Sequence, residues 1–118
     1  MKSYTDIEQS QKLSEILPYK SADMYYHNRV DIPDNFPLPI EWKRGLPLLS
    51  QEIPCWSLSA LLELLDYPQL SKDKLGSEKV GWMVSVYPDN CRYDSCWHDN
   101  PIDACYEMVL KLNEQNLL

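Results

Sequence analysis

Glycine is scarce in this chain. Its 118 residues include only three glycines, and none belongs to a G-x-x-x-x-G-K or G-x-G-x-x-G sequence. Such turns let backbone amides approach a phosphate closely, so their absence excludes the common phosphate-binding loops. Long apolar runs are missing too, because the longest, in "LSALLELL", breaks within a few residues, whereas a membrane span needs about 20. The first residues contain no apolar signal-peptide core. We therefore expect a cytoplasmic protein that does not contact a membrane.

Basic residues are outnumbered. Eleven Lys and Arg face eighteen Asp and Glu, which gives a net charge of −7. The densest basic group, Lys72, Lys74 and Lys79, is interleaved with Asp73 and Glu78. Binding to phosphates needs a concentrated basic face, so we expect no direct binding of nucleic acid. The acidity keeps a small protein soluble, and it also suits a basic partner or mimicry of nucleic acid.

The overall composition is that of a folded protein. Hydrophobic residues make up 44% of the chain, enough to exclude wholesale disorder. A chain of this length supports one core and is too short for two. We therefore expect a single domain spanning residues 1–118.

Three amphipathic helices are predicted from apolar residues at helical spacing. They lie at about residues 6–17, 57–66 and 101–115. Thr5 and Glu8 form a capping-box pair before the first helix, and Ser57 is a good N-cap for the second. Asn100 followed by Pro101 marks the start of the third.

Period-two alternation predicts a β-hairpin at residues 79–87 and 90–97, preceded by a polar, lysine-rich connection. Aromatic residues predict a third strand near 22–27. Residues 31–54 carry five prolines, which disfavour regular structure, yet they are too apolar for a free linker. We expect this segment to pack over the domain as an irregular flap. These elements together predict an α+β fold, in which three helices pack on a small antiparallel sheet.

The stretch "RYDSCWHDNPIDACYEM", residues 92–108, has the composition of a site. However, Cys55, Cys91, Cys96 and Cys105 include no C-x2-C pair of the kind that structural zinc uses, so we expect no metal and no cofactor. Cys96 and His98 lie two apart on a predicted strand, with Cβ atoms about 7 Å from each other, too far for a nucleophile–base pair. The alternative is a thiol- or metal-dependent enzyme centred on Cys91, Cys96 and His98.

We interpret this stretch as a strand end followed by a helix cap. Trp97 is predicted to pack inward, and His98 on the opposite strand face to be solvent-accessible. Asn100 should accept a hydrogen bond from the amide of residue 102 or 103. Cys105 should be buried against the sheet, and Glu107 should face solvent on the last helix.

Aromatic residues are abundant, with four tryptophans and eight tyrosines. Tyr25, Tyr26, Trp42 and Trp97 border irregular segments, so we expect them to be partly exposed. Because interfaces favour Tyr and Trp, these four are the candidate interface residues.

Three stretches carry a resemblance: "YTDIEQSQKLSEILPYKSADM", "IPCWSLSALLELL" and "DNPIDACYEMVLKLNEQNLL". They resemble short uncharacterised proteins of bacterial prophages and mobile elements, and the order of parts is similar to the phage ABA-sandwich domain. The resemblance implies a layered α/β sandwich and a mobile-element origin, and it implies no catalytic residue.

The leading functional hypothesis is a small non-enzymatic accessory protein that acts through contact with a protein partner. Two alternatives stay open: the thiol- or metal-dependent enzyme, and an acidic nucleic-acid mimic that inhibits a host protein.

Overall fold

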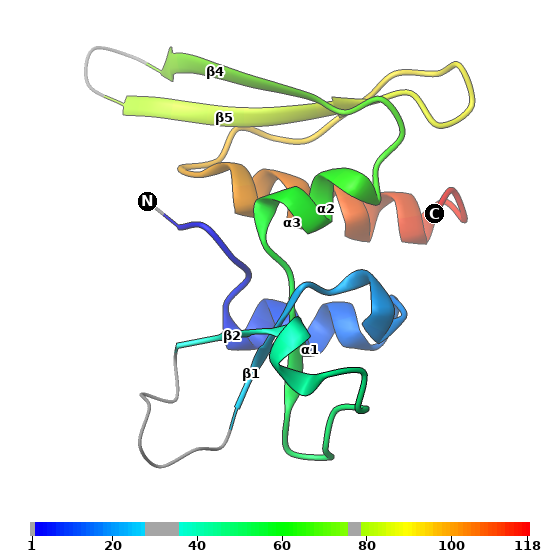
Figure 1. The fold of residues 1–118 in the computed structure, drawn as a ribbon. Helices are drawn as coiled ribbons and strands as arrows, with labels where there is room; N and C mark the ends of the chain where they lie inside the picture. Colours follow the sequence, from blue (N-terminus) through cyan, green and yellow to red (C-terminus); the bar gives the residue numbers. More distant parts are fainter. Residues whose placement is uncertain (1, 28–35, 76–78) are drawn as a thin grey trace.

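The computed structural model describes residues 2–27, 36–75 and 79–118. Within these ranges the chain has an α+β fold with three α-helices and two three-stranded antiparallel sheets. The elements are α1 (Ile7–Ser14), β1 (Met24–Tyr26), β2 (Leu38–Pro39), β3 (Ile53–Cys55), α2 (Leu58–Glu63), β4 (Gln69–Leu75), β5 (Lys79–Val86), β6 (Tyr93–Asp94) and α3 (Pro101–Glu114), with two 3-10 helices, η1 (Tyr19–Ser21) and η2 (Ile40–Lys43) (Figure 1). The three predicted helices are confirmed, the first two with shorter bounds. None of the described helices combines the length and apolar character that crossing a bilayer requires.

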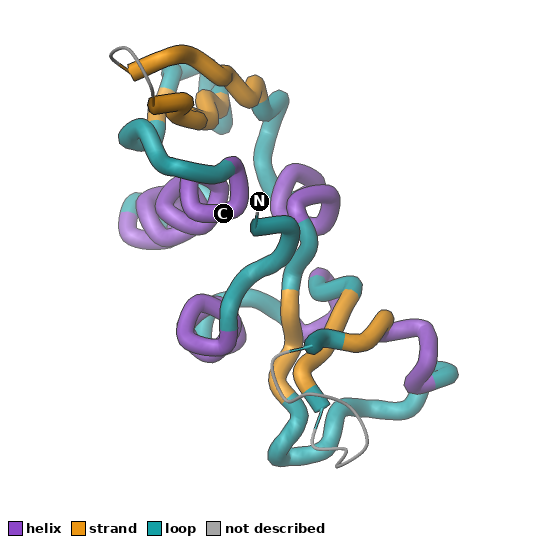
Figure 2. The backbone as a smooth tube through the Cα atoms, turned by 90° about the vertical axis from the view of Figure 1, so that its left-hand side faces the viewer, coloured by secondary structure: helices purple, strands orange, loops and turns teal. Residues whose placement is uncertain are grey.

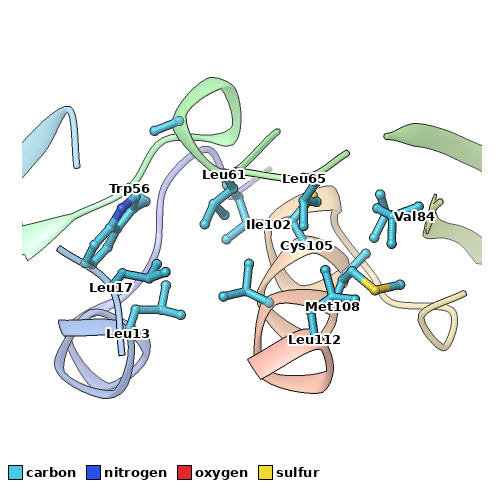
Figure 3. Packing of buried hydrophobic residues seen from close by; sticks show 14 of the residues in the cluster. Leu13, Leu17, Trp56, Leu61, Leu65, Val84, Ile102, Cys105, Met108 and Leu112 are labelled. Atoms are coloured by element: carbon cyan, nitrogen blue, oxygen red, sulfur yellow. The ribbon is translucent and has the colours of Figure 1, made fainter. Parts of the chain in front are cut away.

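The elements are stacked in layers. The sheet of β4, β5 and β6 lies over α2 and α3, and α1 with the small sheet of β1, β2 and β3 lies on the other side of these helices (Figures 1 and 2). One buried hydrophobic cluster joins the layers. It includes Leu13 of α1, Trp56 before α2, Val84 of β5 and Met108 of α3, all fully buried (Figure 3). Each such side chain contributes about 1.5–3 kcal/mol through its burial.

The larger sheet differs from the predicted hairpin. Its strand order is β4-β5-β6, and the lysine-rich segment expected to be a connection is strand β4, paired with β5 from Gln69↔Ser85 to Leu75↔Lys79. In contrast, β6 has only two residues. The prediction missed β4 because it has charged residues in its middle and no apolar alternation to indicate a strand. Among the described residues, β4 has no strand on its outer side, so it forms an edge of the sheet.

The smaller sheet is built largely from the flap. The predicted third strand is confirmed as β1, but it belongs to a separate sheet, between β2 and β3. Both partners come from the 31–54 segment, apart from Cys55, the last residue of β3. The flap is therefore more regular than predicted in its described part, and residues 31–35 lie outside the described residues.

The first helix begins one residue later than expected. Asp6 is the N-cap of α1 and forms a capping box with Gln9, so the predicted pairing of Thr5 with Glu8 is wrong. The reason is that the Thr5 side chain is fully buried and bonded elsewhere. Ser57 is confirmed as the N-cap of α2, where its side chain accepts a bond from the Ala60 amide.

Candidate functional site

A change of register interrupts the pairing of β5 with the segment that follows it. Val86 pairs with Tyr93, and Trp82 pairs with His98. Between these two pairs β5 advances by four residues, whereas the opposite segment advances by five. One extra residue is therefore accommodated between 94 and 98, opposite Val84, which is the definition of a β-bulge.

The bulge reverses the direction of the side chains that follow it. Without the extra residue, Trp97 would lie opposite Trp82 and face the helices, as predicted. With it, His98 takes that place, and Trp97 is 39% exposed. The predicted inward packing of Trp97 is therefore wrong, whereas its exposure agrees with the expectation that it is partly exposed. His98 is also not on the free face of the strand, because its ring contacts Glu107 of α3.

Two side chains supply the hydrogen bonds that the bulge removes from the ladder. The Ser95 hydroxyl accepts a bond from the Val84 amide at 3.0 Å. The Cys96 amide donates to the Glu107 carboxylate at 3.0 Å. Because a buried backbone donor is costly when unpaired, Ser95 stabilises the bulged register at Val84, and Glu107 adds a bond to the exposed amide of Cys96.

Glu107 also binds His98, so the prediction that Glu107 simply faces solvent is wrong. His98 Nε2 lies 2.8 Å from Glu107 Oε1. Partial burial alone would raise the pKa of the Glu107 carboxyl, but the bonds from His98 and from the Cys96 amide outweigh it and hold the pKa below its usual value. An ionised carboxylate can only accept hydrogen bonds, so the Nε2 atom of His98 carries a hydrogen and is the donor in this bond.

The cysteines divide into two kinds. Cys55 and Cys105 are buried, as predicted for Cys105, and burial raises the pKa of the Cys105 thiol to about 12. Such thiols stay protonated and unreactive. Cys91 and Cys96 are exposed. Within the described ranges, no hydrogen bond joins the Cys96 thiol to His98, and no three His, Cys, Asp or Glu side chains are grouped to hold a metal ion.

The cap of α3 is as predicted. The Asp103 amide donates to Asn100 Oδ1 at 2.9 Å, and Pro101 occupies the first turn. Residues 93–107 therefore form a bulged strand and a helix start that support each other.

The flap exposes much of its apolar content. Tyr25 and Tyr26 are buried in the small sheet, so the prediction that they are partly exposed is wrong. Trp42, in contrast, is 57% exposed. In the described part of the flap, the large apolar side chains that are exposed are Phe36, Trp42, Leu46 and Leu49, and we call these four residues the flap surface. Aromatic residues such as Phe and Trp are enriched at protein interfaces, so this segment is a candidate for one.

Two residues of the flap surface, Leu46 and Leu49, lie on the loop between Lys43 and Glu52, which an ion pair closes. The Glu52 carboxylate accepts bonds from Lys43 Nζ at 2.6 Å and from the Leu49 amide at 2.8 Å. Burial alone would raise the pKa of Glu52, but these two bonds lower it. The Lys43 ammonium also lies 5.5 Å from the centre of the Tyr25 ring. Both charged side chains are largely buried, so this pair ties the loop to the small sheet.

A hollow of about 340 Å³ adjoins the flap surface. Tyr19 and Lys20 of η1 line one side, and Gly45 and Leu46, which follow η2, line the other. Gly45 has a backbone φ of 83°, and an added Cβ would meet nothing within 4 Å, so the turn needs glycine for its conformation and not for space.

A second hollow, of about 480 Å³, lies beside the start of α1. It is lined by Lys2, Tyr4, Asp6, Ile7 and Glu8 from the N-terminal segment and by Tyr26 from β1. No local sequence pattern indicated this hollow, because Tyr26 is far along the chain from the other lining residues.

A buried polar cluster holds the N-terminal segment at Thr5, between two residues that line this hollow. Thr5 Oγ1 lies 2.8 Å from Ser10 Oγ and accepts a bond from the Trp56 amide at 3.1 Å. The Thr5 carbonyl accepts from the Tyr26 hydroxyl at 2.7 Å and from the Cys55 thiol at 3.4 Å. Thr5 therefore connects α1, β1 and the residues that lead into α2.

Comparison of the chain with protein-family models, with curated proteins and with solved structures gave no match.

Proposed function

We propose that this protein acts by binding another protein through the flap surface. The observation that carries the proposal is the exposure of Trp42 and Leu46 on a loop that the Lys43–Glu52 pair holds in place. A loop that is already ordered loses little conformational entropy on binding, so its apolar contacts contribute to affinity. The hollow next to Leu46 provides space for one apolar side chain of the partner.

A different protein is a better partner than a second copy of this chain. Each copy carries a net charge of −7, so self-association brings like charges together. A neutral or basic partner meets no such repulsion, and opposite charge accelerates its association.

The role of an accessory protein encoded by a phage or mobile element is part of this proposal. It rests on the sequence resemblance alone. The two alternatives have less support in the described residues. The His98 ring is engaged by Glu107 and not by a thiol. Several carboxylates that a nucleic-acid mimic would present are bonded within the protein, including Asp6, Glu52 and Asp103.

Photo-crosslinking in the native host tests the proposal. Trp42 is replaced by p-benzoylphenylalanine, and the same residue at position 67 is the control, because Tyr67 is 83% exposed and lies outside the flap surface. We expect a specific crosslinked protein from position 42 alone. The purified partner should then bind the wild type in calorimetry.

Two charge-introducing variants complete the test. Leu46→Asp should weaken binding about tenfold or more, since truncated hot-spot residues cost more than about 1 kcal/mol. Tyr67→Asp should leave the affinity within about twofold. Equal loss in both variants, crosslinking that is the same at both positions, or a Leu46-dependent homodimer in sedimentation would refute a heterologous partner at the flap surface.

A further inference from the structure

We propose that the hollow beside the start of α1 binds a cationic side chain, an arginine, of a partner protein. Its walls are Tyr4, Tyr26 and Ile7, with Lys2, Asp6 and Glu8 as the charged lining residues. Tyr26 is buried, so Tyr4 supplies the ring on which a guanidinium can stack, and the carboxylates can accept charge-assisted hydrogen bonds from it. A volume of about 480 Å³ is ample for one such side chain.

The charges around the hollow favour a cation. The Lys2 ammonium is already shared by two carboxylates, 3.0 Å from Asp6 Oδ2 and 2.9 Å from Asp103 Oδ1. Glu8 is in no ion pair within the described residues. The hollow itself is lined by one ammonium and two carboxylates, so its lining carries a surplus of one negative charge. The N-terminus of α1 offsets only about half a charge of this surplus.

The arrangement of the lining residues is fixed before any ligand arrives. The Asp6 carboxylate caps α1 by accepting the Gln9 amide at 2.7 Å. The Tyr26 hydroxyl donates to the Thr5 carbonyl, which holds its ring in place. Glu8 has no such bond to another described residue, so its carboxylate can accept a bond from a ligand.

The hollow shares no residue with the flap surface, so its test is independent of the proposed function. The probe is Nα-acetyl-arginine amide, followed by amide chemical shifts in an NMR titration. Nα-acetyl-citrulline amide has nearly the same shape without the charge and is the matched control. One stacking contact and one exposed ion pair predict a dissociation constant of about 30–300 mM for arginine. The shifts should be confined to residues 4–8 and 26, and citrulline should bind at least about fivefold more weakly.

Two variants with equal net charge separate a site from general attraction. Glu8→Gln should weaken arginine binding at least about threefold, because it removes the unpaired carboxylate. Glu15→Gln removes a charge from the other end of α1, outside the hollow, and should have no effect. The inference fails if citrulline binds as well as arginine, if Glu15→Gln weakens binding as much as Glu8→Gln, or if the shifts spread over the whole surface. Leu46→Asp should leave arginine binding unchanged, whichever way the flap surface experiment ends.

Discussion

Replacing Thr5 by valine tests whether the buried polar cluster holds the N-terminal segment in place. Valine keeps the size and the β-branch of threonine and removes only the hydroxyl. The Trp56 amide, which donates to that hydroxyl at 3.1 Å, then has no acceptor. Both residues are fully buried, so water cannot replace the lost partner.

The expected cost follows from the groups left unpaired. One buried donor without a partner costs about 1–3 kcal/mol. The Ser10 hydroxyl also loses its bond to Thr5 Oγ1, but this loss costs less. The Thr5 carbonyl already lies 3.5 Å away and can accept a hydrogen bond from Ser10. We therefore expect Thr5→Val to lower the free energy of unfolding by about 2 kcal/mol.

Thr5→Ser is the matched control. It keeps the hydroxyl and removes one buried methyl group, which costs about 1 kcal/mol. Urea unfolding followed by tryptophan fluorescence measures both variants, since the buried Trp56 reports on the same region. If Thr5→Val is as stable as Thr5→Ser, or more stable, the hydroxyl does not organise this cluster and the reasoning is wrong.

Three further variants test other parts of the fold. Ser95→Ala removes the acceptor of the buried Val84 amide in the bulge and should cost about 1–3 kcal/mol in a denaturant melt. Asn100→Ala should cost about 1 kcal/mol through the lost cap of α3, and an unchanged melting midpoint would contradict this role. The pKa of Glu52 is lower in the folded state than its unfolded value of about 4.3. The stability that Glu52 contributes to the fold is therefore complete above about pH 4.3 and is lost as the pH falls through the folded pKa. Urea midpoints between about pH 2 and 7 should therefore fall less on acidification in Glu52→Gln than in wild type, whereas the exposed Glu63→Gln should follow the wild type.

The helices could be predicted because their signals are local. Ser57 and Asn100 cap helices within three residues of themselves, and apolar spacing identifies the buried face. The bulge could not be predicted, since its register depends on Glu107, which reaches Cys96 from another element. The predicted direction of the Trp97 side chain was wrong for the same reason, because it depended on the register.

The candidate sites were predicted less well, for the same reason. Exposure of Trp42 agreed with expectation, because a proline-rich segment has few ways to bury a large ring. Burial of Tyr25 and Tyr26 required strands from the flap on both sides of β1, which no local pattern indicates. The hollow beside α1 combines Tyr26 with residues some twenty positions earlier, and only the folded chain brings them together.

The outer edge of β4 affects how this protein behaves at high concentration. An open strand edge invites the same edge of another molecule, and repeated pairing leads to fibres. Here the middle of the strand consists of Lys72, Asp73 and Lys74, and all three are exposed. If two copies paired antiparallel about Asp73, Lys72 of each would face Lys74 of the other, and the two aspartates would face each other. Like charges directly opposite are destabilising, so this strand discourages fibre growth by its own sequence.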